Sequence, residues 1–408
     1  MWFCSLTKTV QWADVYLYRS VLLFIRSEGC TIVVDHSQSK NWQFALRQMR
    51  VPIMFVTAVV LLAALWMALQ RSGWEIPIFG GVSPAQHGAV MVAGFLGKLI
   101  CLERVVALQR PWAYAVPVVM CAGAIVLLTG ISPTVGRTVL VIGAMGFVLL
   151  CLLMYKLHPT LDVAIMANGA VCLFFGNSLW LLNMPMHNSV PWWIGFLVLT
   201  IAGERLELAR MLRLSVGKRV AFVFAISVFL AGLATTLVSF ETGVQIAGLG
   251  LVALAAWLML FDVARRTVDQ IGLPRYIAVC LLTGYIWLLV GGLLWLIFAP
   301  YFVGGVYYDA MLHSIFLGFV FSMIFGHAPI IMPAILNVPV VYTPRYYAHL
   351  ALLHTALLVR IVGDLSVSPL IQRWGSTFNV IAILLFIVSS AIAVRSVLSI
   401  KQRLINSQ

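Results

Sequence analysis

The sequence predicts an all-α polytopic membrane protein with about twelve transmembrane helices in three parallel four-helix repeats. Three observations predict it: the composition, a regular succession of apolar runs, and a phrase that occurs three times. The chain of 408 residues is 62% hydrophobic and only 10% charged, and its mean hydropathy is +1.03. This composition excludes an ordinary soluble domain. Any chemistry must therefore lie among the helices or at their ends.

Apolar runs of about 20 residues recur along the whole chain, and a helix of that length crosses a hydrocarbon layer of about 30 Å. The expected spans are 51–70, 85–108, 112–130, 134–156, 160–183, 190–213, 218–239, 243–265, 275–298, 308–333, 346–364 and 374–397. The loops between them are short. The chain is thus divided into an N-terminal tail (1–50), a transmembrane domain (51–398) and a C-terminal tail (399–408).

The N-terminal tail mixes charged residues with short apolar patches. Arg19 and Arg26 interrupt its longest patch, so this segment is not expected to span a membrane, and it shows no signal-peptide pattern. The alternatives are a cytoplasmic tail, an amphipathic segment on the membrane surface, or a true start of translation at Met49 or Met54.

The distribution of Lys and Arg predicts the orientation of the spans, because loops on the cytoplasmic side are enriched in these residues. With a cytoplasmic N-terminus, four arginines fall on the outer side: Arg71, Arg137, Arg360 and Arg373. Most of the others fall on the inner side. The expected location is the cytoplasmic (inner) membrane of a bacterium, with both termini cytoplasmic. This topology explains the net charge of +13, so the expected partner is the lipid bilayer and no nucleic acid is needed. The oligomeric state is left open.

The recurring phrase reads GFLGKLICLER, GFLVLTIAGER and GFVFSMIFGHA. In each copy a polar pair or His-Ala follows the glycine by nine residues: Gly94 to Glu103-Arg104, Gly195 to Glu204-Arg205, and Gly318 to His327-Ala328. The copies fall on the second, sixth and tenth spans, four helices apart, and therefore run in the same direction. This spacing predicts three parallel units around a pseudo-threefold axis. The Glu-Arg pairs are expected to form ion pairs at the inner helix ends, with a proton pathway as the alternative.

Two histidines are candidate haem ligands. His87 and His313 lie near the outer ends of the second and tenth spans, so they share a depth on two helices that the repeat makes equivalent. An iron held by two imidazoles from different helices needs this arrangement. A flat cofactor also needs small residues beside it, and Gly94 and Gly318 are the candidates. The alternative is that each histidine makes a hydrogen bond between helices or at the membrane interface.

A second candidate metal group lies deeper. His327 follows His313 by fourteen residues, which is about 21 Å along a helix. His349 and His354 of the eleventh span would join it, together with Glu103 or Glu204. However, the spacing of five residues does not place His349 and His354 on one helical face. A histidine at a helix end near the lipid headgroups is the alternative for His327.

The plan of twelve helices with His87 and His313 on the second and tenth resembles subunit I of the haem–copper oxidases. That resemblance implies that these two residues are the axial ligands of a low-spin haem. The tenth span lacks a second histidine at this depth, and spans 190–213 and 218–239 contain none for copper. An oxygen-reducing binuclear centre is therefore not expected.

The second and tenth spans are also similar to the NnrS family of polytopic bacterial membrane proteins. The matching residues are His87, Met91 and Gly94 in one span and His313, Gly318, Met323, Gly326 and His327 in the other. The resemblance implies a b-type haem, allows copper as a second metal, and implies a role in nitric oxide stress and denitrification.

Together these observations predict a haem-binding inner-membrane protein that acts in electron transfer or in handling nitric oxide or another diatomic gas. A redox partner or a quinol would exchange electrons with it. No acid–base residue stands out, so no reaction is assigned. One alternative is a secondary transporter, favoured by Lys98, Asn168 and Asn177 within spans. Another is a haem-free assembly factor for a respiratory complex.

Overall fold

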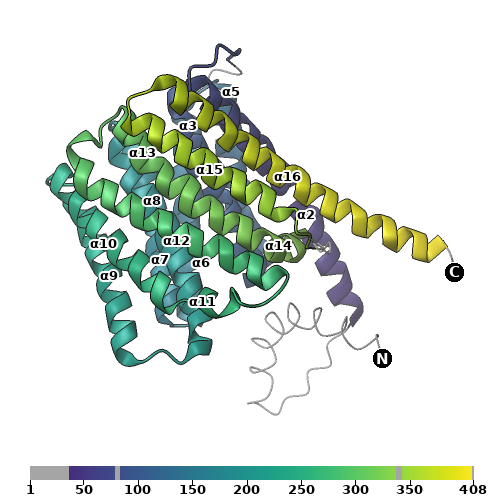
Figure 1. The fold of residues 1–408 in the computed structure, drawn as a ribbon. Coiled ribbons are helices and arrows are strands. Elements are labelled where there is room, and N and C mark those ends of the chain that lie inside the picture. Colours follow the sequence, from purple (N-terminus) through teal and green to yellow (C-terminus); the bar gives the residue numbers. More distant parts are fainter. Residues whose placement is uncertain (1–35, 79–82, 337–341, 407–408) are drawn as a thin grey trace. The chain divides into compact units, whose positions relative to one another are not determined.

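The computed structural model describes residues 36–78, 83–336 and 342–406, and all of their regular secondary structure is helical (Figure 1). The chain divides into two compact units, Met1–Met49 and Arg50–Gln408. Within the first unit, the described residues from His36 onward belong to a helix; the rest of the expected N-terminal tail lies outside the described residues. The second unit contains the membrane helices and the sites described below.

Ten helices of the described chain are long and apolar enough to cross a membrane, which confirms an all-α protein of the multi-pass membrane type. The elements are α2 (His36–Arg71), α3 (His87–Ala89), η2 (Val90–Leu96), α4 (Gly97–Leu108), α5 (Ala115–Thr129), α6 (Pro133–Leu157), α7 (Leu161–Leu181), α8 (Met186–Ala209), α9 (Val216–Thr235), α10 (Phe240–Phe261), α11 (Ala264–Thr267), α12 (Leu273–Phe298), α13 (Val306–His313), η6 (Ser314–Phe321), α14 (Ser322–Leu336), α15 (Tyr346–Leu365) and α16 (Pro369–Asn406).

Two helical segments of similar length are not among the ten: the run from α3 to α4, and α8. They correspond to the expected second and sixth spans, and they are less apolar because they carry charged residues such as Lys98 and Glu204. They are also deeply buried. Every residue of η2 is buried, and so is nearly all of α8 from Ser189 to Leu206. A helix surrounded by protein does not face lipid, so it does not have to be apolar all round.

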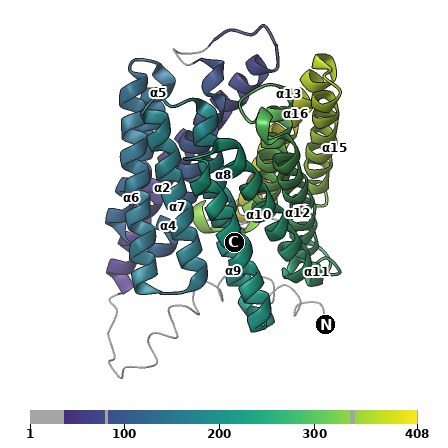
Figure 2. The ribbon, with the colours of Figure 1, turned by 90° about the vertical axis from the view of Figure 1, so that its left-hand side faces the viewer.

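The three copies of the recurring phrase lie on the interior helices. The first two copies are on the segments just described, and the third is on α13–η6–α14, whose span Val306–Pro333 is 67% buried, the largest share of the ten. Helix α8 contacts α7, α9, α10 and η6, and Figure 2 shows it between α7 and α10. The phrase therefore marks the helices that face protein rather than lipid.

Neighbouring helices pack in sequence order, α5 on α6, α6 on α7, α7 on α8, α9 on α10 and α15 on α16, as Figures 1 and 2 show. Glycines let some of these backbones approach closely. A Cβ added at Gly232 of α9 would lie 2.2 Å from the backbone nitrogen of Ala247 on α10. Such small-residue contacts are typical of helix pairs in membranes.

Two interior helices contain π-helical turns, η2 and η6, and both include the Gly-Phe of the phrase. Each π-helical turn follows a histidine, since α3 begins at His87 and α13 ends at His313. The copy of the phrase on α8 is an ordinary α-helix. An extra residue per turn re-aims the side chains that flank it, and π-turns occur frequently at functional sites.

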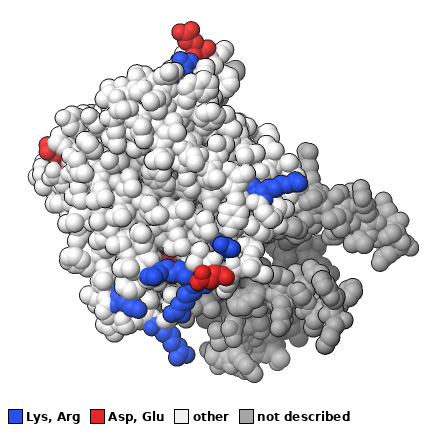
Figure 3. Space-filling model, in the orientation of Figure 1, with Lys and Arg blue, Asp and Glu red and all other residues white. Residues whose placement is uncertain are grey.

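The structure differs from the expected bounds at both ends. Helix α2 already begins at His36, and α16 continues to Asn406, so the expected tails are partly helical. The flanking segments are polar but contain no Gly or Pro that would end a helix. On the face shown in Figure 3, the described Lys, Arg, Asp and Glu side chains lie mainly towards the two ends, with a largely uncharged belt between them.

Candidate functional site

His87 is fixed by a backbone atom of another helix. Its Nδ1 lies 2.8 Å from the carbonyl oxygen of Ala64 on α2. A carbonyl only accepts, so Nδ1 carries the proton and Nε2 keeps its lone pair. Among the described residues, Nε2 of His87 has no hydrogen-bond partner. The imidazole is therefore oriented by one nitrogen and free to bind a ligand with the other.

His313 is fixed in the same way. Its Nδ1 lies 2.9 Å from the carbonyl oxygen of Asp309, one turn earlier on α13, and 3.2 Å from the carboxylate oxygen Oδ1 of the same residue. Its Nε2 also has no hydrogen-bond partner in the described part of the chain. An imidazole whose second nitrogen is held by a carbonyl or carboxylate is the common arrangement of a metal-ligating histidine.

The carboxylate of Asp309 is itself held by Arg360 on α15. Nε of Arg360 lies 2.7 Å from Oδ2 and Nη2 lies 2.9 Å from Oδ1. Asp364, one turn after Arg360, is fully buried and lies in electrostatic range of Asp309. None of these three residues was predicted from the sequence as part of the site. The signal was a pair of i,i+4 spacings, Asp309 with His313 and Arg360 with Asp364.

The structure brings His87 and His313 together. They are in electrostatic range of each other, and Arg71 and Arg360 are in range of His87. The two imidazoles come from helices more than 200 residues apart in the chain and share the end of the bundle at which Arg71 terminates α2. The structure thus places the two histidines near each other, and their joint ligation of one group stays a prediction.

Next to the two glycines expected beside a haem, the space that a side chain would take is filled by neighbouring helices. A Cβ on Gly94 would lie 3.2 Å from Val60 and 3.7 Å from Ala124, and a Cβ on Gly318 would lie 2.4 Å from Cβ and Cγ of Trp287. Both glycines therefore serve helix packing, and their place beside a haem stays a prediction. Gly88, directly after His87, has nothing within 4 Å of such a Cβ and is the glycine next to open space.

At the other end of the interior helices, the polar ends of all three phrase copies meet. Arg104 forms an ion pair with Glu204, and its Nη2 lies 3.7 Å from Oε1 of Glu103. His327 places Nδ1 2.8 Å from the carbonyl oxygen of Met323 and lies in electrostatic range of Arg104, Glu204 and Arg205.

Arg205 belongs to a buried group on the same side of the bundle. It is 3% exposed, and its neighbours Asp262 and Tyr285 are 2% and 0% exposed. Arg205 and Asp262 interact electrostatically, and Tyr285 is in electrostatic range of both. The two Glu-Arg pairs thus have different partners: Arg104 pairs with a glutamate of another copy, whereas Arg205 is balanced by an aspartate.

The expected inner metal group of His327, His349 and His354 is not formed. Nε2 of His349 lies 3.0 Å from the hydroxyl of Tyr276. Both ring nitrogens of His354 are engaged by α12: Nδ1 accepts from Nε1 of Trp287 at 2.9 Å, and Nε2 lies 2.9 Å from Oγ1 of Thr283. In the described part of the chain, no three His, Cys, Asp or Glu side chains converge where they could hold a metal ion. His349 and His354 therefore connect α15 to α12.

A family model described as a domain of unknown function, DUF8744, matches residues 50–395. The match covers the helical bundle from α2 into α16, including both outer histidines and all three copies of the phrase. No curated protein and no solved structure matches the chain.

Proposed function

We propose that this chain, which belongs to the DUF8744 family, binds a b-type haem through His87 and His313 and carries electrons in a membrane. One observation carries the proposal. Two imidazoles on different interior helices lie in electrostatic range of each other, and each is fixed through Nδ1 by a backbone carbonyl so that Nε2 is available.

The donor set fits a haem better than a bare metal ion. A structural metal ion takes four or more protein ligands, whereas a porphyrin brings four nitrogens and needs only two axial side chains. The two imidazoles are such a pair. Arg71, in electrostatic range of His87, is suited to neutralise one propionate, whereas Arg360 is already paired with Asp309. Copper is not included in the proposal, because both ring nitrogens of His354 are bound by α12.

When bound between two histidines, a haem supplies one-electron redox chemistry with no open coordination position, which favours electron transfer over binding of a gas. The chain's own residues would set the properties of the ligands. The carboxylate of Asp309 lies against Nδ1 of His313 and makes that imidazole a stronger donor, as second ligand-shell carboxylates do. Arg360 fixes the carboxylate and moderates its charge. Handling of nitric oxide would require one histidine to leave, and a quinol or a protein would be the electron partner.

The finer architecture belongs to the same proposal. We infer twelve spans in three parallel four-helix units, in a bacterial cytoplasmic membrane with both termini cytoplasmic. The burial of all three phrase copies supports it, as does the meeting of Arg104, Glu204 and His327 at one end. The two π-helical copies are those that follow the histidines, so the unit that contains α8 would have lost or never acquired a ligand.

A reduced-minus-oxidised visible spectrum of the detergent-purified protein tests the haem. The wild type is expected to show a sharp b-type α-band. His87→Ala and His313→Ala should lose it, whereas His158→Ala, at an exposed histidine outside the site, should keep it. His313→Met should retain a band at a shifted position, because a thioether still ligates iron.

A colourless wild-type protein from haem-sufficient cells would overturn the proposal, and so would a band that survives in both alanine variants. Uptake of a solute by proteoliposomes would then be measured, because a secondary transporter transports and an assembly factor does not.

A further inference from the structure

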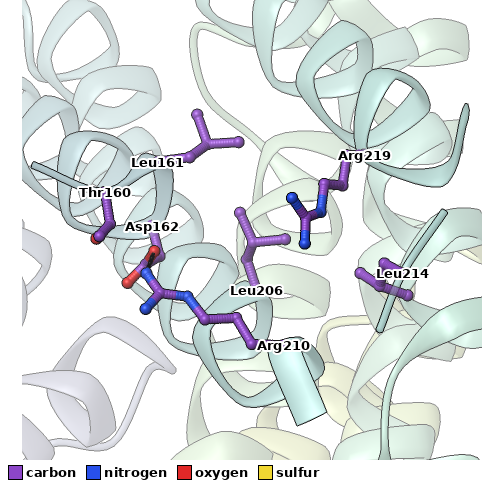
Figure 4. A pocket seen from close by; sticks show the side chains of 7 residues that line it. All are labelled: Thr160, Leu161, Asp162, Leu206, Arg210, Leu214 and Arg219. Carbon is purple, nitrogen blue, oxygen red and sulfur yellow. Dashed lines mark hydrogen bonds and ion pairs between the residues drawn. The ribbon is translucent and has the colours of Figure 1, made fainter. Parts of the chain in front are cut away.

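A pocket with a volume of about 250 Å³ opens between the first turn of α7, the last turns of α8 and the segment that leads into α9 (Figure 4). Three leucines line it, Leu161, Leu206 and Leu214, together with the polar residues Thr160, Asp162, Arg210 and Arg219. The apolar spans of α7 and α9 begin here, at Leu161 and Val216. The pocket therefore lies at the level where a membrane changes from acyl chains to headgroups.

The carboxylate in the pocket already has a cation. Asp162 is almost fully buried and forms an ion pair with Arg210. Glu207 lies in electrostatic range of Asp162 and Arg210, so the charge of Arg210 is balanced by protein groups. An external ligand has little to gain from either member of this pair.

Arg219, on the opposite wall, is not balanced. No carboxylate of the described residues lies within ion-pair distance of its guanidinium, and Figure 4 shows this group directed towards Leu206. The hydroxyl of Thr160 is buried without a hydrogen-bond partner among the described side chains and backbone. The pocket thus offers a free planar cation and a free hydroxyl beside an apolar wall.

The surroundings add positive charge. Arg213 lies on the short connection between α8 and α9, Lys218 lies in the first turn of α9, and both are exposed. Basic pockets between transmembrane helices, close to a basic membrane-proximal segment, are typical binding sites for acidic lipid headgroups. A guanidinium also matches the geometry of a phosphate group with two parallel hydrogen bonds.

We infer that this pocket binds the phosphate of an anionic membrane lipid, with Arg219 on the phosphate and the three leucines against the glycerol and the start of the acyl chains. A free phosphate ion would use the cation but not the apolar wall, which makes a lipid the better occupant. The inference is independent of the haem, because none of the pocket residues belongs to the outer histidine site.

Native mass spectrometry of the purified full chain, titrated with phosphatidylglycerol, tests it. One molecule should be retained by the wild type. Arg219→Gln should weaken retention about tenfold, which corresponds to the loss of one charge-assisted pair, and Arg219→Lys should keep part of it. Arg266→Gln removes an exposed charge of α11 outside the pocket and should change nothing.

Three results would overturn the inference. Unchanged retention in Arg219→Gln would show that the guanidinium does not bind the lipid. Equal retention of zwitterionic phosphatidylcholine would show that the pocket does not select an anion. Displacement of phosphatidylglycerol by millimolar inorganic phosphate would identify a free anion, and not a lipid, as the occupant.

Discussion

Arg360 donates two hydrogen bonds to the carboxylate of Asp309, 2.7 and 2.9 Å long, across two helices whose paired residues are 51 positions apart in the chain. Both side chains are largely buried, 10% and 15% exposed. The same carboxylate lies 3.2 Å from Nδ1 of His313. Asp309 therefore connects the orientation of His313 to the packing of α15 on α13.

The first prediction concerns this ion pair. Arg360→Gln leaves Asp309 near the buried Asp364 without a full cation, and an uncompensated buried charge costs about 3 kcal/mol. Thermal unfolding in detergent should show this loss of stability as a lower unfolding temperature. The double variant Asp309→Asn, Arg360→Gln removes both charges and should recover part of the stability. If the double variant is less stable than Arg360→Gln, the ion pair is not the cause.

The second prediction concerns the three charges at the other end of the interior helices. Glu204→Gln should cost about 1 kcal/mol, because Arg104 can still turn to Glu103, whose Oε1 is 3.7 Å away. Arg104→Gln should cost about 3 kcal/mol, because it leaves two partly buried carboxylates facing each other. The midpoints of thermal unfolding of the two variants are to be compared. Equal midpoints would mean that Glu103 does not serve as a second partner.

The third prediction concerns a glycine that the sequence placed beside a cofactor. In Gly318→Ala the new Cβ would lie 2.4 Å from Trp287, so the indole must move and its 2.9 Å hydrogen bond to His354 must lengthen. Overpacking of this kind costs about 1–3 kcal/mol.

Gly217→Ala is the matched control for that variant, since nothing lies within 4 Å of its added Cβ; it should leave the unfolding temperature unchanged or raise it slightly. A stable Gly318→Ala protein with a lost or shifted haem band would instead mean that Gly318 lies beside the cofactor.

The sequence predicted the ten helices of the described chain that are long and apolar enough to cross a membrane, because lipid imposes a length and a composition on each span. The count of twelve spans stays a prediction. The expected 112–130 and 134–156 correspond to spans Pro111–Thr129 and Pro133–Leu157. It could not predict which helices are interior, since burial by protein does not require an apolar surface. The clearest case is α8, which is among the most buried helices and yet contains Glu204, Arg205 and Glu207.

The site was predicted in part for a similar reason. The depths of His87 and His313 follow from counting along helices, and the structure brings the two together. The residues that hold them do not follow from counting. Ala64 is 23 residues from His87, and Trp287 is 67 residues from His354. Only the packing of the helices reveals that His354 is already bound by protein and that Asp309 has a cation.

The fourth prediction tests the orientation with the two ends of one helix. Val216 is the first residue of α9 and Val238 follows the end of the helix at Thr235. Both are exposed, 78% and 92%. In a background with Cys4 and Cys30 changed to Ser, the remaining cysteines are buried, so new cysteines can be labelled selectively. A membrane-impermeant maleimide should label Val238→Cys in intact spheroplasts and Val216→Cys only after lysis.

Ile271→Cys, an exposed position (88%) before α12, controls for local reactivity, because the expected topology puts it on the same side as Val216. The three positions together separate the outcomes. Labelling of Val216→Cys and Ile271→Cys but not Val238→Cys in intact spheroplasts would invert the orientation derived from Lys and Arg. It would also move the lipid pocket at Arg219 to the outer leaflet. Equal labelling of Val216→Cys and Val238→Cys would mean that α9 does not cross the membrane, which would contradict the four-helix unit to which it is assigned.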